Sequence, residues 1–96
     1  MAEIDLAESV EWYAVRKPGL EVEFIMEVDS TFQRIVANPL AFAEKYKRKN
    51  TWIRAAPLDR FPFMVLFIYN IQEELIIIIA VWHTARNPQK LRRRNA

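Results

Sequence analysis

The chain has no cysteine, one glycine and one histidine among its 96 residues, and each shortage excludes a class of function. Without cysteine there is no disulfide, no thiolate nucleophile and no zinc site with thiolate ligands. A single glycine excludes the glycine-rich loops that hold phosphate in nucleotide-binding folds. A single histidine argues against a metal site, because zinc sites usually need several histidine or cysteine ligands. We therefore expect neither a metal nor a cofactor.

Long hydrophobic runs are also missing. The longest run, Leu75 to Trp82, falls far short of the roughly 20 apolar residues that a membrane-spanning helix needs. The start, MAEIDLAESVEWY, is acidic, whereas a secretory signal begins with basic residues before an apolar core. A length of 96 residues suits one small domain. We expect a single cytoplasmic domain spanning residues 1–96, with no membrane segment.

Charge is distributed unevenly along the chain. Residues 1–34 contain eight acidic and three basic side chains, a net charge of −5. Residues 35–96 contain eleven basic and four acidic side chains, a net charge of +7. This asymmetry indicates that the second part meets an anionic partner, although mutual neutralisation across one surface is the simpler alternative.

Apolar spacing predicts two helices in the acidic part. Apolar residues recur at three-and-four spacing from Ile4 to Val15, and again from Leu20. Pro18 and Gly19 separate the two segments. The second helix is expected to end at Asn38, because a proline follows it and disfavours helical geometry at the residue before.

The second part has the composition of β-strands. Strands are predicted at Thr51–Ala56, Phe61–Tyr69 and Leu75–Trp82, where β-branched and aromatic residues are frequent. The last of these is apolar on both faces, so we expect it at the centre of the sheet. The predicted fold class is α+β, with an N-terminal αα-hairpin packed on a three-stranded antiparallel sheet. Its parts are the helix pair 3–38, the sheet 51–83 and a basic C-terminal tail 84–96.

The basic side chains of the second part are candidates for binding phosphate or another anionic target. One group is expected in the connection before the first strand, where a solvated surface is the simplest interpretation. Arg54 is more informative, because it lies between apolar neighbours on a short strand. The full set is Lys45, Lys47, Arg48, Lys49, Arg54, Arg60, Arg86, Lys90, Arg92, Arg93 and Arg94.

His83 follows the last apolar run and has two interpretations. It is either a hydrogen-bonded structural residue or a general acid–base group, since imidazole can exchange a proton near neutral pH. Arg86 lies close enough in sequence to hold a phosphate beside it. A Ser-His-Asp arrangement is poorly supported, because Ser9 and Ser30, the only serines, fall on predicted helices.

Aromatic residues are frequent on the predicted helices and strands. Trp12, Tyr13, Trp52 and Trp82 could stack on nucleobases. Packing into the core is the interpretation we favour for all four at these spacings.

Four blocks of the sequence, in this order, resemble the RelE/ParE superfamily of bacterial toxins from type II toxin–antitoxin systems. The blocks are EWYAVRKPGLEVEF, RIVANP, IRAAPLDRFPFMVLF and AVWHTARNP. They extend over nearly the whole chain and are more similar to the ParE-like branch than to the RelE-like one. The resemblance implies a small toxin of a plasmid-stabilisation module, neutralised by a partly disordered cognate antitoxin.

The two branches imply different activities. ParE-like toxins inhibit DNA gyrase, whereas RelE-like toxins cut messenger RNA on the ribosome. We expect a growth-inhibiting toxin and favour the gyrase inhibitor. Under the alternative, a ribosome-dependent endoribonuclease, Arg54 and Arg86 would hold the scissile phosphate and His83 would be the acid or base. A further alternative is a decayed, non-toxic chain that serves as a binding module.

The resemblance also implies partners and roles for single residues. Arg54 and Arg60 match the arginines of the superfamily's R…L-x-RFPY block, and His83 with Arg86 match its AV-x-H-x-x-R-x-P block. These matches allow structural roles for Arg60 and His83 as well. The antitoxin is expected to add a helix or strand to the toxin's apolar surface and to cover part of its basic face. A homodimer remains open.

The chain departs from the superfamily pattern at three points. The usual strand before the first helix has no counterpart, since only Met1–Glu3 precedes the helical spacing. Either the natural start lies upstream of Met1 or the strand has been lost. A lost strand would leave its neighbour's backbone open to pairing with another chain. Leu91 stands where the superfamily frequently has tryptophan. No tyrosine follows Tyr69, so the terminal tyrosine of some ribosomal nucleases is absent, and this absence weakens the endoribonuclease hypothesis.

Overall fold

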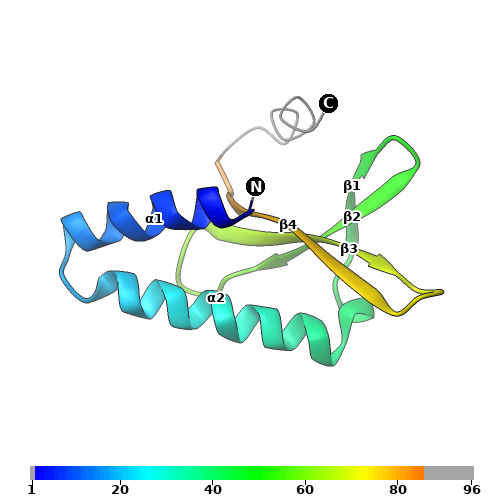
Figure 1. The fold of residues 1–96 in the computed structure, drawn as a ribbon, viewed down its shortest axis with the longest axis horizontal. Helices are drawn as coiled ribbons and strands as arrows, with labels where there is room; N and C mark the ends of the chain where they lie inside the picture. Colours follow the sequence, from blue (N-terminus) through cyan, green and yellow to red (C-terminus); the bar gives the residue numbers. More distant parts are fainter. Residues whose placement is uncertain (1, 86–96) are drawn as a thin grey trace.

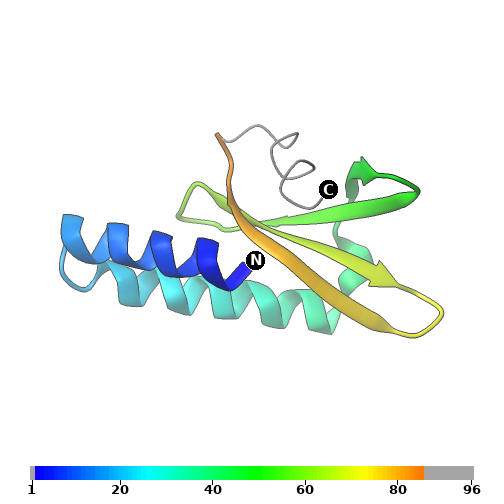
Figure 2. The ribbon, with the colours of Figure 1, turned by 45° about the horizontal axis from the view of Figure 1, so that its top comes forward.

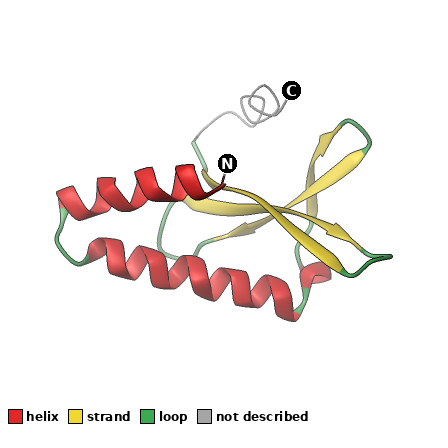
Figure 3. Ribbon diagram, in the orientation of Figure 1, coloured by secondary structure: helices red, strands yellow, loops and turns green. Residues whose placement is uncertain are grey.

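The fold has a layer of two helices against one antiparallel sheet (Figures 1 and 3). The computed structural model describes residues 2–85, with side chains from Glu8 onward. The elements are α1 (Ala2–Arg16), α2 (Leu20–Ala37), the 3-10 helix η1 (Pro39–Ala41), β1 (Glu44–Arg48), β2 (Thr51–Pro57), β3 (Phe63–Asn70) and β4 (Leu75–His83). None of the described helices is long and apolar enough to cross a membrane. The α+β prediction with a helix pair on an antiparallel sheet is confirmed.

The helix pair forms as the sequence predicts. Gly19 lies between the helices at φ 94°, a left-handed conformation that glycine adopts without a steric penalty. Its N–H donates to the carboxylate of Glu21 at 3.0 Å. At the other end of α2, the N–H of Asn38 donates to the carbonyl of Arg34, and Pro39 follows. One side of α2 is buried, through Phe24, Val28, Thr31 and Ile35.

The sheet has the strand order β1-β2-β3-β4, and every neighbouring pair is antiparallel. The predicted number of three strands was therefore wrong, because residues 44–48 add a fourth strand paired with β2. The predicted central position of Leu75–Trp82 was also wrong. β3 lies in the interior of the sheet, whereas β4 is an edge strand that contacts α1. The described residues contain no strand before α1.

The helices lie against the sheet (Figure 2), and the principal core cluster contains buried residues of both layers. Its centre is a cluster of rings in which Phe24 lies 5.0 Å from Tyr13, 5.2 Å from Phe61 and 5.0 Å from Phe63. Rings at tilted and edge-on angles at such distances stabilise one another beyond the area that they bury. The cluster joins α1 and α2 to the β2–β3 loop and to the start of β3, beside the end of β4.

A second apolar cluster lies on the other face of the sheet. Its buried residues are Ile53, Met64, Leu66, Ala80 and Trp82. A β-bulge contributes to it, because Leu66 pairs with Ala80 while Phe67 pairs with Ile78. Ile79 is the extra residue, so Ile79 and Ala80 both contribute to this face. The apolar residues of β4 are thus divided between two clusters.

Candidate functional site

The β1–β2 hairpin carries the densest group of basic side chains in the described residues. Lys45, Lys47 and Arg48 lie on β1, and Lys49 occupies the turn at φ 56°. The three lysines are exposed and Arg48 is half-buried. The hairpin extends away from the helix layer (Figures 1 and 2). The prediction that these residues lie in a connection was wrong. They form an edge strand whose lysines also discourage unwanted strand pairing.

Aromatic rings accompany the cations of this hairpin. Lys47 Nζ lies 5.7 Å from the ring centroid of Trp52, and Lys45 Nζ lies 5.9 Å from that of Tyr46. Trp52 is 45% exposed and Trp12 is 52% exposed, so the expectation that they pack in the core was wrong. For Tyr13 and Trp82, which are buried, it is confirmed. The hairpin therefore combines positive charge with an exposed indole.

Arg54 points into the protein. Its Nη1 donates to the carbonyl oxygen of Phe42 at 2.7 Å, and its Nη2 lies 4.0 Å from Glu44 Oε1. The side chain is only 13% exposed. These contacts hold the segment between η1 and β1 against β2. The arginine that stood out in the sequence thus has a structural role at the base of the hairpin.

Strand register keeps Arg54 away from His83. Arg54 pairs with Phe67 of β3, and His83 pairs with Phe63 of the same strand. Four residues of β3 correspond to about 13 Å, and β2 and β4 are separated by two strand spacings of about 4.8 Å each. The endoribonuclease hypothesis requires Arg54 and His83 to meet at one phosphate, and this register separates them. One phosphate cannot bridge these two side chains.

Arg60 fastens the β2–β3 loop to α2. Its Nη2 donates to Glu23 Oε1 at 3.0 Å. The backbone N–H groups of Asp59 and Arg60 both donate to Glu27 Oε1, at 3.0 and 2.9 Å. The carboxylates that made the first part of the sequence acidic thus act here as acceptors for a loop of the second part. Part of the charge asymmetry is neutralised within the fold.

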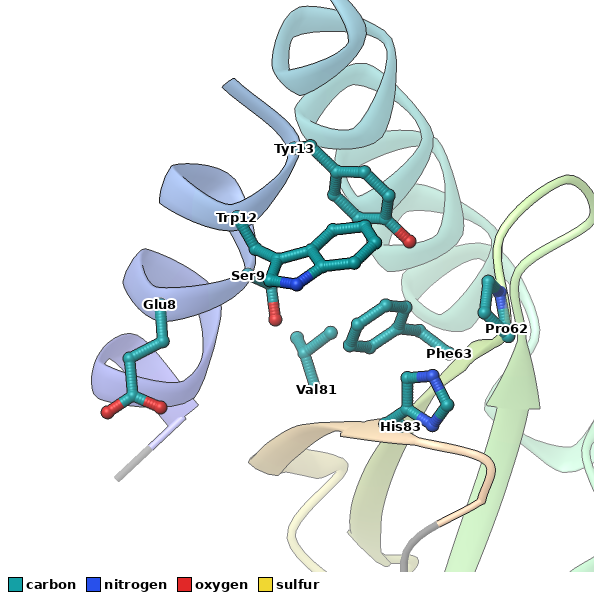
Figure 4. Close-up of a pocket in the computed structure, with 8 residues that line it drawn as sticks. All are labelled: Glu8, Ser9, Trp12, Tyr13, Pro62, Phe63, Val81 and His83. Atoms are coloured by element: carbon teal, nitrogen blue, oxygen red, sulfur yellow. The ribbon is translucent and has the colours of Figure 1, made fainter. Parts of the chain in front are cut away.

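His83 ends β4 beside a pocket that the sequence did not indicate. Its Nδ1 accepts a hydrogen bond from the N–H of Ala85 at 3.1 Å, and its ring lies 5.0 Å from that of Phe63. The N–H of Thr84 donates to the carbonyl of Pro62 at 2.9 Å, which fixes the end of the strand. The pocket has a volume of about 440 Å³ and lies between α1 and the ends of β3 and β4 (Figure 4). Its lining residues are Glu8, Ser9, Trp12, Tyr13, Pro62, Phe63, Val81 and His83.

A family model described as the ParE toxin of the type II toxin–antitoxin system, parDE, matches residues 2–88. The match spans both helices and all four strands. The chain belongs to the ParE toxin family. The resemblance of the four sequence blocks to the RelE/ParE superfamily is thereby confirmed. Comparisons with curated proteins and with solved structures gave no significant match.

Membership of the ParE toxin family implies a cognate antitoxin as a partner. Exposed apolar side chains lie in two regions of the fold. Near the β3–β4 turn these are Ile71, Leu75 and Ile77, at 59%, 47% and 46% exposure. On α2 the exposed residues Val22, Ile25, Met26 and Val36 lie away from the core face.

The remaining candidates of this ParE-family chain lie outside the described residues. They are Arg86, Lys90, Arg92, Arg93 and Arg94. Within the described part, no three histidine, aspartate or glutamate side chains are grouped so that they could hold a metal ion.

Proposed function

We propose that this toxin inhibits growth by binding a macromolecular target, with DNA gyrase the first candidate, and that the β1–β2 hairpin makes the contact. The observation that supports the proposal is the separation of two kinds of basic residue. Four cations gather on a projecting hairpin, whereas Arg54 and Arg60 are engaged in holding the fold together.

The hairpin suits an anionic partner. Its cations are opposed by one acid, Glu44, which lies near Arg54 at the base of the hairpin. Exposed lysines on a protruding element attract an anionic surface over distances up to the Debye length, about 8 Å at physiological salt. Trp52 adds an exposed ring that can stack or pack once the partner has approached. Gyrase acts on DNA, so its complex offers phosphate as well as protein surface.

The arrangement gives little support to RNA cleavage. Catalysis of that kind needs an acid or base and a phosphate-holding cation within contact of one reacting group. Arg54 donates to a backbone carbonyl and is more than two strand spacings from His83. The histidine itself accepts a hydrogen bond from its own turn.

The antitoxin would dock on the outer edge of β4 in this proposal. β4 is an edge strand, and Leu75 and Ile77 on it are exposed. A segment of the antitoxin in extended form would add hydrogen bonds along the edge and cover these side chains. Ile77→Lys should lower antitoxin affinity about tenfold or more, since a charge would be buried at the interface. Unchanged affinity by calorimetry would move the docking site to the exposed face of α2.

The role of the hairpin is tested by substitutions that remove or keep its positive charge. We would induce the chain without antitoxin and compare Lys45→Gln/Lys47→Gln/Lys49→Gln with the variant that has arginine at the same three positions. Both variants change only these three exposed lysines, so folding should be retained. Growth arrest should be lost with glutamine and retained with arginine. Full arrest by the glutamine variant would refute the hairpin's role, and no arrest by the parent chain would favour a non-toxic binding module.

A second assay separates binding from cleavage. Purified ribosomes translating a defined message receive the protein, and RNA ends are mapped by primer extension. Messages should remain intact. Cuts that depend on translation and disappear with His83→Gln would replace the proposal with the endoribonuclease.

A further inference from the structure

We propose that the pocket between α1 and β4 binds an arginine side chain presented by a partner polypeptide. The proposal goes beyond the function above, because it concerns the opposite end of the sheet from the hairpin. It does not depend on which target the toxin inhibits.

Four rings surround the pocket. Trp12 contacts Tyr13 at 5.0 Å with the planes perpendicular, Tyr13 lies 6.2 Å from Phe63, and Phe63 lies 5.0 Å from His83. All four line the same space (Figure 4). The faces of such rings carry partial negative charge and attract cations, most strongly at tryptophan. An enclosure of this kind resembles the aromatic sites that recognise organic cations.

The charge at the pocket has the matching sign. Glu8 supplies a carboxylate to the lining, and no lysine or arginine is among the lining residues. Among residues 8–85, whose side chains are described, Glu8 has no ion-pair partner. The Nδ1 of His83, which also lines the pocket, accepts a hydrogen bond from the N–H of Ala85. A cation entering the pocket would meet one carboxylate and no fixed positive charge among these side chains.

Trp12 already contacts an arginine within the chain. The guanidinium carbon of Arg16 lies 4.5 Å from the centroid of its ring. Arg16 itself is not among the residues that line the pocket. Guanidinium is planar, stacks on aromatic faces and is less strongly hydrated than ammonium, which favours arginine over lysine.

A polypeptide fits the site better than a free small cation. Trp12 is half exposed, and the pocket opens beside it at the junction of a helix and a strand end. A small cation would leave the outer part of this indole in water. A partner chain that inserts arginine would also cover the ring, and arginine and tryptophan are the residues that most often dominate such contacts.

The test follows the indole N–H resonances of the full chain during titration with the peptide acetyl-Gly-Arg-Gly-amide. The citrulline peptide is the neutral control with nearly the same shape. We expect saturable shifts at Trp12 with a dissociation constant in the millimolar range, about the affinity of a single side chain. The citrulline peptide should bind about fivefold more weakly or worse, from loss of the cation–π and ionic contributions.

Matched variants locate the site. Glu8→Gln should weaken the arginine peptide about threefold or more, whereas Glu11→Gln, on the same helix but outside the lining, should not. Trp12→Leu should abolish binding, and Trp52→Leu, which removes a tryptophan of similar exposure, should leave it unchanged. Because Glu8 is exposed, its variant tests the proposal even if Trp12→Leu fails to fold.

Five results would overturn the proposal. Equal binding of the citrulline peptide would show that the positive charge is not required. An effect of Glu11→Gln equal to that of Glu8→Gln would show that the peptide does not bind in this pocket. Binding of guanidinium chloride as tightly as the peptide would assign the pocket to a free cation. A Trp12 shift on dilution alone would assign it to a second copy of the chain. A Trp12 shift caused by Arg92→Gln/Arg93→Gln/Arg94→Gln without peptide would assign it to the chain's own C-terminal segment.

Discussion

Arg54→Ala distinguishes a structural arginine from a functional one. The charge-assisted hydrogen bond to Phe42 should contribute about 1.5–3 kcal/mol. The pair with Glu44, at 4.0 Å and with the carboxylate 46% exposed, should add less than about 0.5 kcal/mol after solvent screening. Loss of buried methylene groups contributes about 0.8 kcal/mol each. Together these give a loss of at least about 3 kcal/mol in the free energy of unfolding.

Urea denaturation and thermal melting measure this loss directly. In a domain of this length, about 3 kcal/mol corresponds to a fall in Tm of roughly 12–24 °C. Glu44→Gln is the control and should cost less than about 0.5 kcal/mol. Lost toxicity of Arg54→Ala would then follow from lost folding. A stability change below about 0.5 kcal/mol together with lost target inhibition would refute the reasoning, because Arg54 would then act at a functional surface.

Three further predictions concern the helix–sheet interface. Phe24→Ala should cost about 3–5 kcal/mol in urea denaturation, because the ring is fully buried among three others; a cost as small as that of its half-exposed neighbour Ile25→Ala would contradict this. Glu27→Ala should cost about 1–3 kcal/mol of stability, because two backbone N–H groups lose a charged acceptor. This loss of stability should be larger than that of Glu23→Ala, because Arg60, the partner of Glu23, is largely exposed. Burial raises the pKa of Tyr13 above 10.0. The neutral phenol therefore contributes stability that is fully present below pH 10 and is lost as pH rises through the folded-state pKa. Tyr13→Phe should make the loss of stability above pH 10 shallower, and an unchanged slope would show that Tyr13 does not titrate.

The helices could be predicted closely because their signals are local. Apolar spacing placed the core face of α2, and Pro39 marked the end of the helix where Asn38 caps it. β1 could not be predicted, because EKYKR is charged at nearly every position. An edge strand exposed to solvent needs no apolar alternation, and the pairing that defines it comes from β2.

The position of β4 was missed for a different reason. Its apolar run correctly indicated burial on two faces, but burial on two faces does not require a strand on each side. β4 is covered by α1 on one face and contributes to a second cluster on the other, while its bulge at Ile79 adds an apolar residue there.

The candidate site was only partly visible in the sequence. The basic residues of the hairpin were identified, although not their arrangement on a strand with Trp52. Arg54 drew attention because it is a charge among apolar residues, and the structure explains it by a carbonyl that needs a donor. The pocket could not be predicted, since Glu8 and Trp12 meet Phe63 and His83 only through tertiary packing.

Gyrase supercoiling tests the central claim most directly. Purified gyrase, ATP and relaxed plasmid are incubated with the chain, with its hairpin glutamine variant and with its hairpin arginine variant. The parent chain and the arginine variant should inhibit supercoiling, and the glutamine variant should inhibit at least about tenfold less well, since the loss of three charged contacts weakens binding. Full supercoiling activity in the presence of a parent chain that arrests growth would contradict the account.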